Sequence, residues 1–171
     1  ANIIEVGQVL ALPPAPNQTT PDEILLANAL FVRNEHGGVF DVAAFIEAQP
    51  GYIRSATDEV NTNRANGFPN LQRLSAAQII DRVSQEFGVD TRLLLAMLEY
   101  RAGWLTNPQP AEALRSFPMI SEEDSETVNR EGLYRQLAWT ANELNRGYYG
   151  RKYNNWEILE FPEAERLLYA R

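Results

Sequence analysis

The chain has 171 residues, 44% of them hydrophobic, and carries 23 acidic against 15 basic side chains for a net charge of -8. A negative charge of this size repels nucleic acid and anionic membrane surfaces, so we expect no nucleic-acid partner. No apolar run approaches the roughly 18 residues needed to cross a bilayer, so we expect no membrane insertion. The composition is that of a globular protein.

The chain has no cysteine and one histidine. The lack of cysteine excludes disulfides, thiolate zinc sites and thiol nucleophiles. His36 lies in NEHGG, where paired glycines indicate a solvated turn, and a single histidine argues against His-rich metal sites and a Ser/His/Asp triad. The acidic run SEEDSE lacks the spacing of a calcium loop and is typical of a solvated helix N-terminus. We therefore expect no metal and no cofactor.

The N-terminal part of the chain predicts extended structure. Residues 1–12, ANIIEVGQVLAL, alternate loosely as a short strand does. PPAPNQTTP follows, and its prolines favour an extended linker or surface arm, which we place over residues 14–40. The chain opens without a basic and hydrophobic leader, so we expect a mature form or a piece of a longer protein.

The next segment predicts short elements. Asp41 is a good N-cap for the helix VAAFIEAQ, which Pro50 and Gly51 end. We expect a second short helical piece over residues 52–60. Residues 61–70, NTNRANGFPN, are rich in asparagine and helix breakers, so we expect a loop there.

The clearest signals are two consecutive helices. Ser75 and Gln78 form a capping box at the start of a helix over about residues 75–87, and Asp90 caps a second helix over about residues 90–102. Their short connection makes the helices packing neighbours. Because the second helix is apolar around nearly its whole circumference, we expect it to be buried on most sides at the centre of the domain.

A third long helix is expected over about residues 125–146, with Gly147 as its stop. Residues 151–161 read as a strand or hairpin arm, and residues 162–171 as a last amphipathic turn. These elements predict a mainly α fold: a compact helical domain over residues 41–171, with the extended proline-rich N-terminal arm and a short C-terminal β-like tail.

The stretch LLLAMLEYRAGW places Glu99 at the end of an apolar helix. Burial penalises the ionised form and raises the pKa of a carboxyl, which is what the general acid of glycoside cleavage requires. The alternative is that Glu99 points to solvent or pairs with Arg101.

Aromatic side chains near this helix are candidate platforms for sugar rings. Tyr100 and Trp104 follow Glu99, and Tyr148 and Tyr149 follow the third helix in GYYG. They would supply flat apolar surfaces with polar rims. The alternative is that they pack in the core or at its edge.

FGVDTRLLLAMLEYRAGW resembles the catalytic-helix region of the lysozyme-like lytic transglycosylases. This resemblance implies a lysozyme-like domain in which Glu99 is the single acid/base. Tyr100 stands where that family has serine. Residues 132–136, GLYRQ, echo the family's downstream Gly-Leu-Met-Gln, which adds Tyr134 and Gln136 as candidate substrate-binding residues.

A second resemblance covers most of the chain. FDVAAFIEAQPGYI, FGVDTRLLLAMLEYRAGWLTN and GLYRQLAWTANELNRGYYG are similar to the region between LysM repeats and the lysostaphin-type zinc endopeptidase domain in envelope proteins of Chloroflexota-like bacteria. NIIEVGQVLALP resembles the last strand of a LysM module, which makes residues 1–13 a LysM-like remnant too short to bind glycan. With one histidine, no peptidase activity of that zinc-dependent type can reside here.

Together the resemblances imply an extracellular or cell-envelope protein that binds peptidoglycan or another glycan. If active, it would be a lytic transglycosylase or lysozyme-like glycosidase using Glu99. One alternative is a non-catalytic helical module that binds wall glycan or protein. Another is a structural module that contacts protein subunits of a larger surface assembly.

Overall fold

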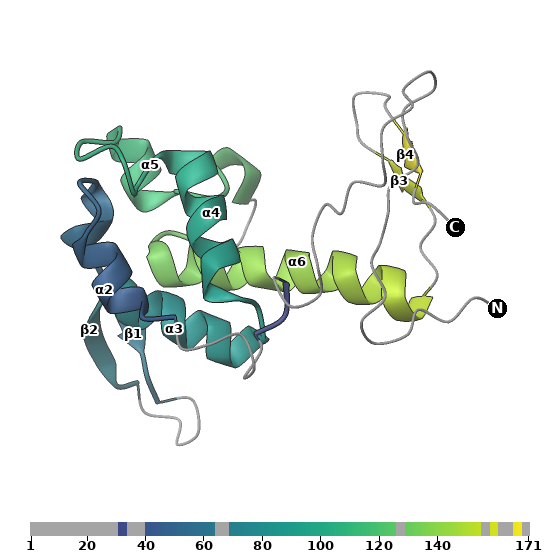
Figure 1. Cartoon of the computed structure of the whole chain (residues 1–171), viewed down its shortest axis with the longest axis horizontal. Coiled ribbons are helices and arrows are strands. Elements are labelled where there is room, and N and C mark those ends of the chain that lie inside the picture. The colour runs from purple at the N-terminus through teal and green to yellow at the C-terminus, as the bar shows by residue number, and fades with distance from the viewer. Residues whose placement is uncertain are drawn as a thin grey trace.

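The computed structural model describes residues 31–33, 40–63, 69–125, 129–154, 158–160 and 166–168. Figure 1 shows α3 beside α6, with α4 and α5 above them, the β1–β2 hairpin at one end and β3–β4 near the far end of α6. In chain order the elements are α2 (Val42–Glu47), η1 (Tyr52–Arg54), β1 (Thr57–Asn61), β2 (Leu71–Ser75), α3 (Ala76–Phe87), α4 (Thr91–Ala102), α5 (Glu112–Ser116), η2 (Glu123–Ser125), α6 (Leu133–Asn154), β3 (Ile158–Glu160) and β4 (Arg166–Leu168).

The predicted fold class, mainly α and lysozyme-like, is wrong. Among the described residues, five helices are combined with an antiparallel hairpin, β1–β2, set between α2 and α3. Its register runs from Thr57 opposite Ser75 to Asn61 opposite Leu71. β3 and β4 form a second antiparallel pair, so residues 166–168 are a strand where we predicted an amphipathic turn.

The hairpin escaped prediction because its signal is not local. In β1 only Val60 is buried, so the strand shows no run of alternating apolar residues. What stabilises it is pairing with β2, from Asn61 opposite Leu71 to Thr57 opposite Ser75, across a segment that reads as loop. The helical piece predicted over residues 52–60 is limited to the single turn η1, and β1 follows.

The helix starts predicted from capping residues are confirmed. Asp41 Oδ1 accepts a hydrogen bond from Ala44 N–H, 2.9 Å, at the start of α2. Ser75 and Gln78 form the complete capping box of α3. Asp90 caps α4 by accepting from the Arg92 N–H. These signals work because each is contained within a few residues.

The long helix α6 begins at Leu133, not near residue 125, and runs through Gly147 to Asn154. Its start is set from the hairpin: Asp58 Oδ2 accepts a hydrogen bond from the Tyr134 N–H, 3.0 Å, across 76 residues of sequence. A glycine inside a helix costs only about 1 kcal/mol relative to alanine, so Gly147 does not end a helix that packs against α3.

The core lies between α3, α4 and α6 and extends to the inner sides of α2 and the hairpin. α4 was predicted to be buried on most sides; one face is fully buried, Leu93 and Met97 on the opposite face pack partly against the core, and Ala96, Tyr100 and Arg101 are exposed. Its buried residues are Thr91, Leu94, Leu95, Leu98 and Ala102.

The earliest described residues are tied to the turn between α3 and α4. Val32 forms an antiparallel bridge with Val89, the Asp90 N–H donates to the Phe31 carbonyl, and the Arg33 N–H donates to the Gly88 carbonyl. The LysM-like remnant at residues 1–13 and most of the predicted arm at residues 14–40 lie outside the described residues. Within the described part of the chain, no helix combines the length and the apolarity needed to cross a membrane.

Candidate functional site

Glu99 lies on the last turn of α4, and its carboxylate faces the loop that follows the helix. One oxygen, Oε2, accepts hydrogen bonds from the Leu105 N–H at 2.8 Å and the Thr106 N–H at 3.3 Å. The other, Oε1, accepts from the Thr106 hydroxyl at 2.6 Å. Both oxygens are therefore used to hold residues 105–106 against the helix end. This is the geometry of a loop anchor, and the acid role predicted for Glu99 stays a prediction.

The same loop is held from its other side by η1. Gly51 packs so closely that a Cβ there would lie 2.2 Å from the Trp104 carbonyl oxygen. The Ile53 N–H donates to that carbonyl and the Tyr52 N–H donates to the Asn107 carbonyl, each at 3.0 Å. The loop after α4 is therefore held by Glu99 on one side and by residues 51–53 on the other, and these contacts serve the fold.

Trp104 is part of this packing, and the role of sugar platform predicted for it stays a prediction. Its side chain is 2% exposed, and its indole N–H donates to the Leu114 carbonyl at 2.9 Å. The ring meets Tyr52 edge to face, with centroids 4.8 Å apart. A sugar ring would have to displace these contacts in order to stack on Trp104.

Gln136 is fully buried on α6. Its side-chain oxygen accepts from the Met119 N–H at 3.0 Å and the Ile120 N–H at 2.8 Å, and its amide donates to the Arg130 carbonyl. A buried amide with these partners ties the segment before α6 to the helix. Gln136 is 0% exposed, and the substrate-binding role predicted for it stays a prediction.

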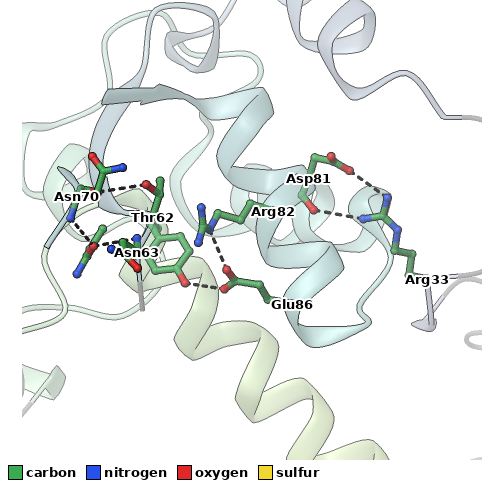
Figure 2. A network of polar contacts seen from close by, with 9 residues as sticks. Arg33, Thr62, Asn63, Asn70, Asp81, Arg82 and Glu86 are labelled. Atoms are coloured by element: carbon green, nitrogen blue, oxygen red, sulfur yellow. Dashed lines mark hydrogen bonds and ion pairs between the residues drawn. The ribbon is translucent and has the colours of Figure 1, made fainter. Parts of the chain in front are cut away.

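Tyr134 is half-buried at the start of α6, and its hydroxyl donates to Glu86 Oε2 at 2.6 Å. Glu86 also accepts from the Arg82 guanidinium at 2.8 Å, and Arg82 lies over the Tyr134 ring. Figure 2 shows Arg82 directed at Glu86 on α3, and Arg33 directed at Asp81, the residue before Arg82 on the same helix. These contacts fasten α6 and the N-terminal segment to α3.

Tyr148 and Tyr149 lie near the end of α6, where Tyr148 stacks on Phe31 with ring centroids 4.4 Å apart. Tyr149 meets Tyr148 edge to face and is 41% exposed. Tyr100 lies on α4 and is 84% exposed. Of the predicted substrate-binding residues, the structure brings Tyr148 and Tyr149 together, while Trp104 and Gln136 are enclosed elsewhere and Tyr100 stands on another helix.

Asp90 and Arg92 form an ion pair that shifts the pKa of both side chains. Burial by itself would raise the pKa of the Asp90 carboxyl, but hydrogen bonds from the Arg92 side chain and backbone, together with the Arg92 charge, hold that pKa below its usual value. The bond to Asp90 raises the pKa of Arg92 in turn. The pair caps α4 and serves the fold.

In the described portion of the chain, no three histidine, cysteine or acidic side chains gather as metal ligands would. The residue that sequence reasoning missed is Thr106, the main partner of Glu99. A threonine seven positions beyond a glutamate, just past a glycine helix stop, is a weak signal but a readable one, because a polar loop residue there can reach back to the last helical turn.

The chain belongs to the family of the LasA N-terminal domain, because the family model described as "LasA, N-terminal domain" matches residues 24–166. The family is one of secreted proteins, and LasA itself is a staphylolytic endopeptidase. No curated protein and no solved structure gives a significant match to the chain.

Proposed function

We propose that this chain is a non-catalytic domain of a secreted protein that acts on peptidoglycan, and that it associates with the wall outside the cell while another domain supplies the chemistry. The observation that carries this proposal is the bonding of Glu99. A general acid must present a proton to the leaving oxygen, whereas both oxygens of Glu99 face donors from residues 105–106.

Family membership supports the wall as the setting. The family is named after the N-terminal domain of a staphylolytic endopeptidase, and the resemblance to a region beside lysostaphin-type endopeptidase domains points the same way. One histidine and no cysteine leave this chain without the ligands of a zinc peptidase. An accessory role next to a zinc peptidase fits the family membership, the resemblance and the lack of zinc ligands.

Glutamate-based glycan cleavage is the competing hypothesis. It requires the Glu99 carboxylate to leave the Thr106 hydroxyl and turn toward a bound sugar. The second alternative from the sequence, a structural module that binds protein subunits, predicts no affinity for purified wall.

Co-sedimentation with purified sacculi tests the proposal. We expect the protein to pellet with sacculi and to stay in solution without them, and Glu99→Gln to pellet to the same extent because Glu99 faces the loop. A protein that remains in the supernatant at every sacculus concentration would refute wall association.

A further inference from the structure

α4 has a second apolar face, opposite the one that builds the core. Leu93, Ala96, Met97 and Tyr100 follow the spacing that places residues on one side of a helix. We call these four residues the outward face of α4. Ala96 and Tyr100 are exposed, with Tyr100 at 84%, and Leu93 and Met97 are half-buried.

Only part of this face is used by the core: Leu93 and Met97 pack partly against it, whereas Ala96 and Tyr100 meet solvent. At about 100° per residue, its centre lies roughly half a turn away from the buried side chains of Leu94, Leu98 and Ala102. A helix side that only meets water is normally polar. Contiguous apolar side chains on the surface are instead typical of a binding site.

The charges around the outward face favour an anionic ligand. Arg101 flanks it, is exposed, and has no carboxylate partner among the described residues, since its Nε donates to the Met119 carbonyl. The nearby acidic groups are already engaged: Asp90 pairs with Arg92, and Glu99 holds the loop. Arg101 is therefore a cation at the edge of the outward face that can pair with an anionic ligand.

The size of the face favours a small ligand. Leu93 and Tyr100 are about 10 Å apart along the helix axis. A stable protein complex needs about 800 Å² from each partner, more than this stripe can provide. A ligand of this size binds weakly as a single copy and firmly only when a polymer presents many copies.

We propose that the outward face of α4 binds the stem peptides of peptidoglycan, a proposal that rests on the wall association proposed above. An extended tetrapeptide spans about 13 Å, close to the length of the stripe. Its alanine methyl groups would pack on Met97 and Tyr100, and one of its carboxylates would pair with Arg101. A neutral glycan strand makes no use of Arg101, and the aromatic side chains that could stack on sugars are dispersed.

The test is an NMR titration of the ¹⁵N-labelled protein with the soluble stem tetrapeptide of alanine, glutamate, diaminopimelate and alanine. Matched probes are the same peptide with its carboxylates amidated and a neutral tetrasaccharide of N-acetylglucosamine. We expect amide shifts confined to the outward face and Arg101, with amidation weakening the affinity about tenfold, the value of one charge-assisted hydrogen bond. Absent shifts, shifts mapping to another surface, equal affinity for the amidated peptide, or binding of the tetrasaccharide alone would each overturn the proposal.

Two variants and a control sharpen the result. Tyr100→Ala and Arg101→Gln should each lower the affinity for the tetrapeptide. Tyr149→Ala, which removes an exposed aromatic side chain from another helix, should leave that affinity unchanged. Because Tyr100 is highly exposed, its variant should keep the dispersed spectrum of the folded protein. If the protein sediments with sacculi but does not bind the tetrapeptide, this inference is refuted and wall association stands. If it neither sediments with sacculi nor binds the tetrapeptide, this inference and the proposed wall association are both refuted.

Discussion

The Thr106 hydroxyl donates a hydrogen bond of 2.6 Å to Glu99 Oε1, and this contact turns a glutamate at the end of an apolar helix into an anchor for the loop beyond it. The Leu105 N–H on Oε2 completes the arrangement. A carboxylate that accepts from backbone donors stabilises the chain in the way a helix cap does.

Removing the anchor should destabilise the protein. We expect Glu99→Ala to lower the free energy of unfolding by about 1–3 kcal/mol, because the Leu105 and Thr106 N–H groups lose their acceptor. Glu99→Gln, which keeps an acceptor oxygen, should lose less. Urea denaturation of both variants measures the difference. A double-mutant cycle with Thr106→Val should show coupling, and strictly additive effects would contradict the contact.

The contact between the hairpin and the start of α6, which we call the joint, gives a second prediction. Gly132 has φ 97°, and a Cβ there would lie 2.7 Å from Asp58 Oδ2, the atom that caps the helix. Gly132→Ala should therefore destabilise by more than about 1 kcal/mol. Gly147→Ala is the matched control: a Cβ at that helical position meets nothing within 4 Å, so it should stabilise by about 0.5–1 kcal/mol. Equal effects of the two substitutions in thermal denaturation would count against this account of the joint.

The buried side-chain amide of Gln136 gives a third prediction. Gln136→Leu leaves the Met119 and Ile120 N–H groups without their acceptor, at about 1–3 kcal/mol for each buried group. We expect a large drop in the thermal midpoint by calorimetry. Gln72→Leu, the same change at an exposed position of β2, should leave the midpoint nearly unchanged. A mild effect at Gln136 would show that the contacts to residues 119–120 do not hold the segment.

Stability should depend on pH through Asp90. The pKa of its carboxyl is lower in the folded protein than the ordinary aspartate value of 3.8, so the contribution of Asp90 to stability is complete above that value and is lost as the pH falls through the folded pKa. Asp90→Asn should be less stable than wild type at neutral pH, and the gap should narrow below about pH 4. Chemical denaturation at a series of pH values measures the gap, and a constant difference down to the lowest pH would contradict the assignment.

The sequence predicts what is local in this fold. The capping residues Asp41, Ser75 and Asp90 mark helix starts because each cap bonds within three residues of itself. The hairpin and the start of α6 depend on partners far along the chain, such as Asp58 and Tyr134, which no local pattern connects. The mainly α prediction fails for that reason.

In the candidate site, too, local features could be predicted from the sequence and long-range contacts could not. The position of Glu99 at the end of an apolar helix is readable from LLLAMLEYRAGW, but the direction of its carboxylate depends on the path of residues 104–107 after Gly103. Likewise Trp104 reads as an exposed platform or a core residue until its contact with the Leu114 carbonyl is known. Residue type fixes what a side chain can do, and tertiary contacts decide whether it is free to do it.

We propose that Glu99 is a loop anchor and not a catalytic acid, and the most direct test is mass spectrometry of soluble muropeptides after incubation with purified peptidoglycan. Wild type and Glu99→Gln are compared with buffer alone and with a known muramidase as a positive control. We predict no release above buffer from either protein. Release by wild type that Glu99→Gln abolishes, while the variant remains folded, would contradict the account and make Glu99 the acid of an active site.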